Sequence, residues 1–461
     1  MRRHELRMMR FVLIAVALLC AAPTLQGQTL APTPPMGWNS WDAFGFTIDE
    51  SDFRANVSVL ATLKSFGWNY AVIDEGWYME NPLGSTLAER RYLLDANGLL
   101  MPVAARFPSA SGDRGFKPLA DSVHALGLKF GIHIVRGIPK QAVDDNLPIA
   151  NSSFHSVDAA DRSDTCPWDD GNYGVADNAA GQAYYDSMIK RYAAWGLDFI
   201  KVDCIADHPY RPSEIRQIAT AIERSRRPIV LSLSPGPTQL VHAEEVIRHA
   251  QMWRIADDLW DGWVLPHEHP QDQVPNGLLS AFDNLAKWSK YAGPGHWPDA
   301  DMLPFGALTP HPGWGEARQS RLTQDEERSE LTLWAIARSP LIMGGNLTKL
   351  DDFTRSLLTN RNVIELNQRA RSSAAITDLP PGFEHVRVWR SELRAARNGR
   401  PSVAVALFNL ADKPVSLHAT GPQLGLRSGA HLRDLWTGRV ATSDEVSLTL
   451  PAHGCAVYRV E

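Results

Sequence analysis

The sequence has no excess of positive charge and no long apolar stretch beyond its first residues, and each absence narrows the possible functions. The formal net charge is −6 and no basic run follows the first few residues, so nucleic acid is not an expected partner. No stretch after residue 27 resembles a membrane span, and no repeat of solenoid length is present. With 461 residues, the chain is long enough for two domains and a large core.

The first residues predict an export signal rather than part of the fold. Several arginines precede the apolar run from Phe11 to Ala22, which is too short to span a bilayer comfortably. Small or polar residues follow this run, which predicts cleavage between Ala22 and Gln28. Cys20 would suit a lipoprotein site, but Leu19 before it is a poor fit. We therefore expect residues 1–27 to be a signal peptide, and the protein to be soluble and exported, either periplasmic or secreted.

Residues 28–370 alternate strand and helix signals, which predicts parallel βα units. Short apolar runs are the strand candidates, and helical spacings of apolar residues separate them. Eight such units predict a closed (β/α)8 TIM barrel. Residues 136–178 interrupt the alternation as a long loop-like stretch. The strand candidates are 36–38, 70–74, 129–134, 197–202, 229–233, 252–255, the region of 295–301, and 340–343.

The pattern changes after residue 370, and residues 371–461 predict a second domain. Short runs of strand-forming residues are separated there by Gly, Pro, Asn and Asp. Such runs predict an antiparallel β domain, with a β-sandwich as the expected form. The chain also has fifteen tryptophans, which fit either stacking on sugar faces or core packing.

The stretch from Gly196 to Cys204 is the centre of the predicted site. Its apolar residues predict a strand buried on both faces, yet Lys201 lies inside it and Asp203 ends it. A charge in a buried strand is costly unless it is paired or functional. One interpretation is a structural ion pair between Lys201 and Asp203. The other places Asp203 at the carboxyl end of a barrel strand, where such folds carry their catalytic groups.

A second acidic site follows the strand at 252–255. Arg254 lies at the end of that strand, and Asp258 follows four residues later in the loop. Carboxylates that follow two different barrel strands can face each other across the barrel mouth, as a glycosidase requires of its nucleophile and its acid/base. The alternative is that Asp257 or Asp258 only caps a turn or pairs with Arg254.

A series of short motifs follows the predicted barrel from Thr33 to about Gln368. The motifs are Pro-Pro-Met-Gly-Trp at 34–38, Ile-Asp-Glu-Gly-Trp at 73–77, Gly-Leu-Lys-Phe-Gly-Ile at 127–132, Lys-Val-Asp at 201–203, Trp-Arg at 253–254, Ala-Gly-Pro-Gly-His-Trp at 292–297, Asp-Met-Leu at 301–303 and Leu-Trp-Ala-Ile at 333–336. Each motif alone is weak, but their order at the ends of barrel strands is specific. Taken in order, they resemble glycoside hydrolase family 27, the family of α-galactosidases and α-N-acetylgalactosaminidases, and a C-terminal β domain of the expected kind follows them.

The resemblance implies roles for the residues at the two acidic sites. Asp203 matches the nucleophile, which forms a covalent glycosyl-enzyme, and Asp258 matches the acid/base. Arg254 matches an arginine that binds the sugar. Lys201 matches a lysine that donates to sugar hydroxyls, and its charge would favour the ionised form of Asp203.

The resemblance also implies which residues form the sugar pocket. Asp74 and Glu75 stand at the paired-acid position that accepts hydrogen bonds from the 4- and 6-hydroxyls of galactose. Trp41 and Trp77 match aromatic walls of the pocket. His133 stands where the family has a tyrosine, and it is either a packed residue or a direct sugar contact.

Two departures from the family pattern concern the substrate. Its α-galactosidases usually have two aspartates where this chain has Asp74 and Glu75, and the longer Glu75 would extend into the space of the sugar's CH2OH group. That resembles the family's β-L-arabinopyranosidases, whose substrate lacks this group. The segment Leu233-Ser234-Pro235-Gly236 is small where α-galactosidases of animals and plants have bulky residues that recognise the 2-hydroxyl. We count Ser234 as a substrate-binding candidate, and a small segment there is nearer to an opening for an N-acetyl group.

The sequence thus predicts an exported retaining exo-glycosidase that hydrolyses terminal α-D-galactosides. Neither a metal nor an organic cofactor is expected, and the expected partner is a carbohydrate with a terminal galactose-like sugar. The alternatives within the family are β-L-arabinopyranosidase and α-N-acetylgalactosaminidase. From another class, a carbohydrate-binding protein on an inactive glycosidase scaffold is the alternative, and the presence of both Asp203 and Asp258 argues against it.

Two structural expectations complete this interpretation. Cys166 and Cys204 could form a disulfide in an oxidising compartment, although the sequence does not show that they are close. The C-terminal domain is expected to cover hydrophobic surface of the barrel and to shape the edge of the pocket. The oligomeric state is not predicted.

Overall fold

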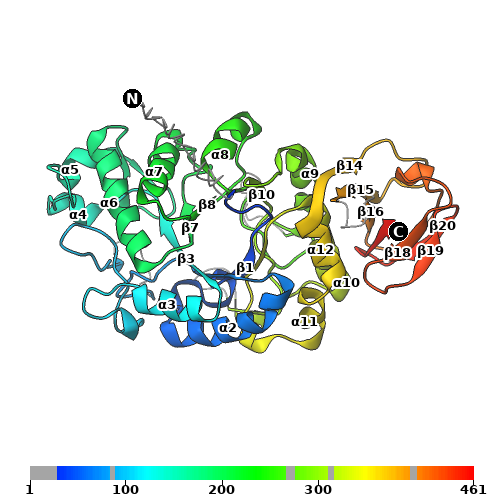
Figure 1. The fold of residues 1–461 in the computed structure, drawn as a ribbon, viewed down its shortest axis with the longest axis horizontal. Helices are drawn as coiled ribbons and strands as arrows, with labels where there is room; N and C mark the ends of the chain where they lie inside the picture. Colours follow the sequence, from blue (N-terminus) through cyan, green and yellow to red (C-terminus); the bar gives the residue numbers. More distant parts are fainter. Residues whose placement is uncertain (1–28, 84–88, 266–275, 310–315, 395–401, 461) are drawn as a thin grey trace, which may run out of the picture.

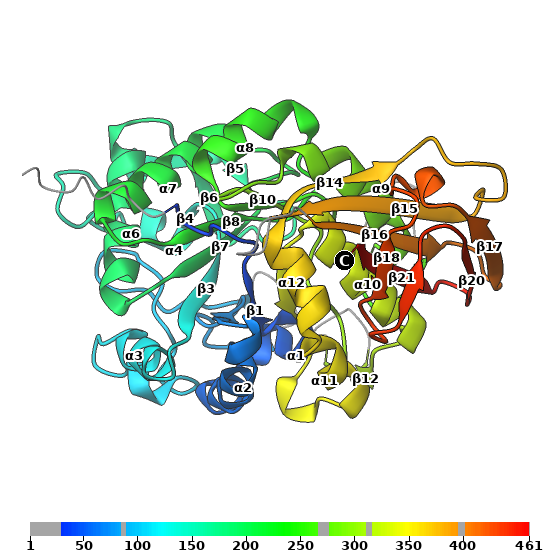
Figure 2. The ribbon, with the colours of Figure 1, turned by 45° about the vertical axis from the view of Figure 1, so that its right-hand side comes forward.

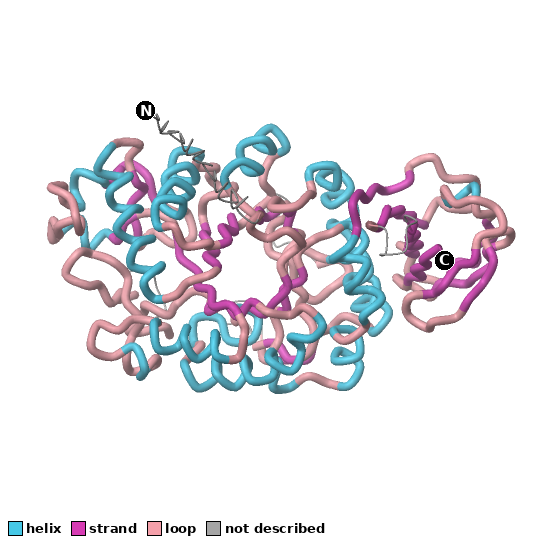
Figure 3. The backbone as a smooth tube through the Cα atoms, viewed as in Figure 1, coloured by secondary structure: helices cyan, strands magenta, loops and turns pink. Residues whose placement is uncertain are grey.

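The computed structural model describes residues 29–83, 89–265, 276–309, 316–394 and 402–460. The predicted signal peptide lies outside these described residues. No helix among them is both long enough and apolar enough to cross a membrane. Figures 1 and 3 show two parts, a ring of strands enclosed by helices and a smaller domain of strands that contains the C-terminus.

The ring is an eight-stranded parallel barrel, so the predicted (β/α)8 fold is confirmed. Strands that follow one another in the chain pair in parallel around the ring. The circle closes between the last two barrel strands. Leu303, which follows the first of them, bridges to Met343 in the second, and its N–H donates to Ile342 O at 2.8 Å. The strands are β1 (Met36–Asn39), β2 (Tyr70–Ile73), β3 (Lys129–Val135), β7 (Phe199–Asp203), β8 (Val230–Leu233), β9 (Met252–Arg254), β10 (Trp297–Asp299) and β13 (Leu341–Met343).

Helices cover the outside of the barrel (Figure 3), and local signals set their ends. Asn178 caps one helix by accepting a hydrogen bond from Gly181 N at 2.8 Å, and the same helix ends at Gly196 with a φ of 95° that favours glycine. Thr323 and Glu326 form a capping box at the start of another. The helices are α1 (Trp41–Phe44), α2 (Glu50–Leu63), α3 (Lys117–Ala125), α6 (Ala179–Trp195), α7 (Pro212–Ser225), α8 (Ala243–His249), α9 (Leu278–Trp288), α10 (Gln324–Ala337), α11 (Asp352–Leu358) and α12 (Arg361–Arg369).

Side chains alternate along each barrel strand, and this alternation decides which of them enter the barrel. In β7, Ile200 packs outward in the large core between strands and helices, whereas Phe199 belongs to a separate apolar cluster inside the barrel. Steps of two from Phe199 bring Lys201 and then Asp203 to the barrel axis, toward its carboxyl end. The same alternation brings in the residues at the ends of neighbouring strands, which are Asp74 after β2, Ser234 after β8 and Arg254 in β9.

Residues 136–178 are not the long loop that the sequence pattern predicted. They contain a three-stranded antiparallel sheet of β4 (Ile138–Pro139), β6 (Asn172–Val175) and β5 (Ala160–Thr165), with the short helices α4 (Lys140–Asp144) and α5 (Ser156–Ala159). The β5 sequence Ala-Asp-Arg-Ser-Asp-Thr has no apolar alternation because none of its residues is buried. Hydrophobic periodicity therefore could not reveal this strand.

The C-terminal domain is the predicted antiparallel β-sandwich. One sheet has the order β14 (Ala370–Ile376), β15 (Val386–Leu393), β16 (Ser402–Asn409), β21 (Cys455–Val460), β18 (His431–Asp434), β19 (Val440–Thr442), and the other pairs β17 (Val415–Ala419) with β20 (Val446–Leu450). Figure 2 shows the long strands β15 and β16 beside α10. Trp389 and Phe408 on one face of the larger sheet join the core of the barrel, whereas Val388 and Leu407 face the smaller sheet.

Candidate active site

A cavity of about 480 Å³ opens at the carboxyl ends of the barrel strands, the face on which such barrels carry their active sites. Its walls come from β7, β9, the loops after β1, β2, β7, β8, β9 and β10, and the connection between β5 and β6. No described residue of the C-terminal domain lines it, so among the described residues that domain covers the barrel and does not shape the pocket edge. The sequence-predicted residues that line the cavity are Trp41, Asp74, Glu75, Lys201, Asp203, Arg254 and Asp258.

Asp203 ends β7 with its carboxylate against an imidazole. His133 Nε2, from β3, lies 3.0 Å from Asp203 Oδ2, and His133 itself is fully buried. Burial alone would raise the pKa of Asp203, but Lys201, His133 and the Ser234 hydroxyl outweigh burial and hold that pKa well below its usual range. Asp203 is therefore ionised at neutral pH, as a carboxylate nucleophile must be.

Lys201 pairs directly with Asp74 rather than with Asp203. Its Nζ lies 3.0 Å from Asp74 Oδ2, and the same oxygen accepts a hydrogen bond from Asn39 Nδ2 at 2.6 Å. Burial would raise the pKa of Asp74, but Lys201 and His133 lower it below its usual value. The sequence left open whether Lys201 forms a structural ion pair with Asp203. In the structure Lys201 lies between two ionised carboxylates that both line the cavity.

Glu75 lies beside a second acid, Asp169, in the connection between β5 and β6. Both carboxyl groups line the cavity. Asp169 also accepts from Tyr92 Oη at 3.0 Å and pairs with Arg90 Nη1 at 3.1 Å. Burial and the Asp169 carboxylate raise the pKa of Glu75 well above its usual range. The paired acids of the motif therefore differ in charge, with Asp74 ionised and Glu75 favouring its neutral form.

Arg254 joins the predicted acid/base to a buried acid. Its Nη2 lies 3.3 Å from Asp258 Oδ1 and 2.7 Å from Asp301 Oδ2. The Asp258 side chain is 36% exposed, so it faces the open side of the cavity, whereas the Asp301 side chain is 5% exposed. Asp301 also accepts a hydrogen bond from Leu259 N at 2.8 Å, which fixes the loop that carries Asp258. Asp258 therefore does pair with Arg254, which was the structural alternative in the sequence interpretation. It also lines the cavity.

Three sequence-predicted residues do not line this cavity. Trp77 is fully buried among aromatic rings of the core, and its Nε1 donates to His133 O at 2.7 Å. His133 and Ser234 lie beneath the cavity floor and contribute to the low pKa of Asp203. These three residues pack behind the cavity wall and do not line the space that a sugar would fill.

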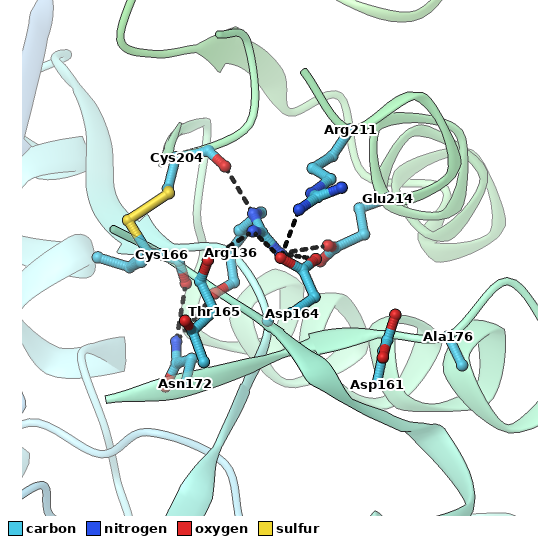
Figure 4. Close-up of polar contacts among 12 residues, drawn as sticks. Arg136, Asp161, Asp164, Thr165, Cys166, Asn172, Ala176, Cys204, Arg211 and Glu214 are labelled. Atoms are coloured by element: carbon cyan, nitrogen blue, oxygen red, sulfur yellow. Dashed lines mark hydrogen bonds and ion pairs between the residues drawn. A yellow bond between two sulfur atoms is a disulfide. The ribbon is translucent and has the colours of Figure 1, made fainter. Parts of the chain in front are cut away.

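A disulfide and a buried arginine connect the segment between β5 and β6 to the end of β7, the strand that carries Asp203. The predicted disulfide between Cys166 and Cys204 is present, with a Cα–Cα distance of 6.0 Å. Arg136 Nε donates to Cys204 O at 2.6 Å, and Arg136 Nη1 pairs with Glu214 at 2.7 Å and with Asp164 at 2.9 Å (Figure 4). Residues 167–169, between these anchors and β6, reach the cavity.

Several cavity residues were not predicted from the sequence, because loops bring them there. Of these, Pro235, Asp257, Asp301 and Met302 stand in segments that carried a signal in the sequence, but the sequence did not place them in the pocket. No group of three or more His, Cys, Asp or Glu residues in the described ranges is arranged to hold a metal ion. The additional lining residues are Asp42, Phe46, Arg90, Pro167, Trp168, Asp169, His208, Pro235, Asp257, Leu259, Trp260, Asp301 and Met302.

Comparisons with known proteins point to one group of enzymes. A family model described as "Alpha galactosidase A" matches residues 167–369, and one described as "Alpha galactosidase C-terminal beta sandwich domain" matches residues 384–460. Alpha-galactosidase A of Cellvibrio japonicus is 29% identical over 450 residues, which cover 94% of this chain and 93% of that protein. The α-N-acetylgalactosaminidase of Gallus gallus is 26% identical over 453 residues, with 93% of each chain covered.

Among solved structures, this chain is similar to a GH27 β-L-arabinopyranosidase from Geobacillus stearothermophilus in complex with arabinose. The two are 41% identical with a TM-score of 0.85, and the match covers 94% of this chain and 98% of the other.

Proposed function

The chain belongs to glycoside hydrolase family 27, and we propose that it is a retaining exo-glycosidase which removes a terminal sugar of galactose-like configuration. The observation that carries the proposal is the presence of two carboxyl groups, Asp203 from β7 and Asp258 from the loop after β9, on the wall of one cavity. A retaining glycosidase uses two such groups, about 5–5.5 Å apart, as nucleophile and acid/base. A cavity of about 480 Å³ suits one end of a sugar chain, which supports exo action.

In the proposed first step, a carboxylate oxygen of Asp203 attacks the anomeric carbon while Asp258 gives its proton to the glycosidic oxygen. The bond from the anomeric carbon to the leaving group breaks, and a glycosyl ester of Asp203 forms. In the second step Asp258 takes a proton from a water molecule, whose oxygen attacks the anomeric carbon and releases Asp203. The lowered pKa of Asp203 and the partial exposure of Asp258 toward entering water support this division of roles.

The favoured substrate depends on the wall opposite Asp258, which includes Glu75. An α-D-galactoside has a CH2OH group on C5 that would face this wall, and a β-L-arabinopyranoside lacks it. The curated relatives named α-galactosidase support the galactoside. Glu75, which is one methylene longer than aspartate, lies on this wall beside Asp169. The 41% identical β-L-arabinopyranosidase is a second, independent support for the sugar without CH2OH. We therefore place β-L-arabinopyranosides first and α-D-galactosides second.

The experiment is an activity panel on the purified protein with aryl β-L-arabinopyranoside, aryl α-D-galactoside and aryl α-N-acetylgalactosaminide. We expect turnover of the first two, with retained anomeric configuration in the first product seen by NMR. Inversion would contradict the assignment of Asp203 as a nucleophile. No turnover of any of the three would favour the alternative of a carbohydrate-binding protein.

Export remains part of the proposal. The predicted signal peptide at residues 1–27 lies outside the described residues, and the disulfide between Cys166 and Cys204 supports an oxidising compartment. Expression of the full chain, followed by N-terminal sequencing of the mature protein, tests it. A mature N-terminus at residue 1 in the soluble cell fraction would contradict export.

A further inference from the structure

Asp257 is a buried carboxyl group in the cavity that the two-carboxylate mechanism does not use. It directly precedes Asp258 in the chain and is 1% exposed. Its Oδ1 lies 3.6 Å from His208 Nε2, while its Oδ2 receives no hydrogen bond from any described residue. Among the described residues, Oδ1 of the nucleophile Asp203 is likewise buried without a donor. A buried acceptor without a donor is costly, so both groups are suited to a ligand that donates hydrogen bonds.

The neighbouring loop makes room for the segment that carries Asp257. Gly236, after β8, donates its N–H to Ala256 O at 3.2 Å. A Cβ atom on this glycine would lie 2.5 Å from the same oxygen and 2.7 Å from Ala256 N, so a side chain there would push the segment away. The small Ser-Pro-Gly segment was expected to leave an opening for an N-acetyl group. In the structure the backbone before Asp257 occupies the room that Gly236 leaves.

We propose that Asp257 is a further substrate-binding residue, which accepts a hydrogen bond from the 2-hydroxyl of the sugar and disfavours an acetamido group at that position. The inference rests on the proposed function, because it takes Asp203 and Asp258 as the groups that act at the anomeric carbon, C1. Asp257 and Asp258 are chain neighbours, with Cα atoms about 3.8 Å apart. Asp257 therefore lies close to C1, and the hydroxyl-bearing neighbour of C1 is C2, since the ring oxygen has no proton to donate.

The positions of the barrel strands also support a place for Asp257 near C1 and C2 of the sugar. β9, which precedes Asp257, lies across the barrel from β2, with β8, β7 and β3 between them on one side and β10, β13 and β1 on the other. Asp74 and Glu75 follow β2, so they and Asp257 stand on opposite walls of the mouth. Asp257 is thus remote from the C5 substituent, which the proposed function places on the wall with Glu75.

The burial of Asp257 favours the 2-hydroxyl, rather than the leaving group, as the group that it binds. The side chain of Asp258, which must reach the leaving group, is 36% exposed, whereas that of Asp257 is 2% exposed. The leaving group therefore lies toward the open side and Asp257 toward the bound sugar. His208 and Pro235 line the cavity as well, and in this proposal they are the residues that the acetyl part of an acetamido group would meet.

The test compares two sugars that differ only in the 2-hydroxyl. Competitive inhibition by D-galactose and by 2-deoxy-D-galactose is measured at pH 7.5 against the aryl glycoside that the wild type hydrolyses best. Loss of a hydrogen bond to a charged acceptor costs roughly 10- to 100-fold in affinity, so the wild type should bind galactose more tightly by about that factor. In Asp257→Ala the preference should fall at least about fivefold, with binding of the 2-deoxy sugar nearly unchanged.

Asp207→Asn is the matched control, because Asp207 contacts the same His208 at 3.1 Å and does not line the cavity. This variant should keep the wild-type preference. An unchanged preference in Asp257→Ala, or an equal loss of both sugars, would overturn the assignment. If the wild type hydrolyses no aryl glycoside and binds neither sugar, the proposed function fails and the assignment fails with it. Turnover with an unchanged preference removes the role of Asp257 alone.

Discussion

His133 Nε2 lies 3.0 Å from Asp203 Oδ2, in a part of the barrel that solvent does not reach on the histidine side. His133 is three strand positions along β3 from Phe130, and its backbone carbonyl accepts the indole N–H of Trp77. Burial and the hydrogen bond from Trp77 therefore fix the position of His133. The contact of His133 with Asp203 helps to keep Asp203 ionised.

The first prediction follows from this contact. His133→Phe removes the donor and should lower kcat/KM on the order of 10²-fold, since a misplaced reacting group costs about that much. Activity needs ionised Asp203, and loss of His133 raises the pKa of Asp203, so the acidic limb of the pH profile should move to higher pH. His133→Tyr, which supplies a hydroxyl in place of the imidazole at a position where the family has tyrosine, is the matched control and should lose less activity. Wild-type activity and an unshifted pH profile in His133→Phe would show that the contact has no catalytic role.

The second prediction separates the roles of the two carboxylates. Asp203→Gly should abolish turnover, and azide should partly restore it and give a glycosyl azide of configuration opposite to that of the substrate. Asp258→Ala should reduce hydrolysis of substrates with poor leaving groups by about 10²- to 10⁴-fold and affect nitrophenyl glycosides far less, because only the former need a proton. Equal losses on both substrate types would contradict the acid/base role of Asp258.

The third prediction concerns the methylene of Glu75. One methylene's fit in a pocket is worth roughly 1–3 kcal/mol, or about 10- to 200-fold in specificity. Glu75→Asp should therefore raise the ratio of α-galactosidase to β-L-arabinopyranosidase activity at least about tenfold. The two values of kcat/KM provide the measurement, and Glu75→Gln, which keeps the length, should leave the ratio closer to that of the wild type. A flat ratio in Glu75→Asp with both activities intact would mean that Glu75 does not contact the C5 substituent.

The fourth prediction concerns the disulfide between Cys166 and Cys204. The two cysteines are 38 residues apart, and cross-links of this kind typically stabilise by about 2–4 kcal/mol. Cys166→Ser should lower Tm. It should also make residues 167–169 more mobile, and because these residues line the cavity, KM should rise. Cys455→Ser leaves the cross-link in place and is the control. Thiol titration of the denatured mature protein should find Cys455 alone, and three reactive thiols would contradict the bond.

The fifth prediction concerns pH and a buried acid remote from the cavity. Burial first, and then the nearby Asp351, raise the pKa of Glu327 in α10 to about 8. Between pH 4.5, the usual value, and pH 8 the unfolded chain loses this proton and the folded chain keeps it, so stability falls as pH rises by at most about 1.4 kcal/mol per unit. Glu327→Gln should remove this part of the fall. Melting curves of both proteins at pH 5 and pH 8 provide the test, and a Tm difference that does not depend on pH would contradict it.

The sequence by itself determined the barrel and its two acidic sites. Apolar runs separated by helical spacings require βα units, and strand alternation sends Lys201 and Asp203 to the same face as Phe199. Local geometry thus fixes the side of the strand on which a residue lies, whatever the rest of the chain does. The ends of parallel strands meet at one face of a barrel, so Asp258 could be placed near Asp203 without coordinates.

Only the tertiary structure decided which of the remaining residues touch the cavity. Trp77 follows a barrel strand as Glu75 does, yet its ring turns into the aromatic core. Asp169 and His208 lie on connections whose paths depend on contacts between distant parts of the chain, such as Cys166 with Cys204 and Arg136 with Asp164. Charge state follows the same rule, because the neutral form of Glu75 depends on burial and on an acid 94 positions later in the chain. Loop paths and pKa values are set by packing over the whole fold, and no local pattern contains that information.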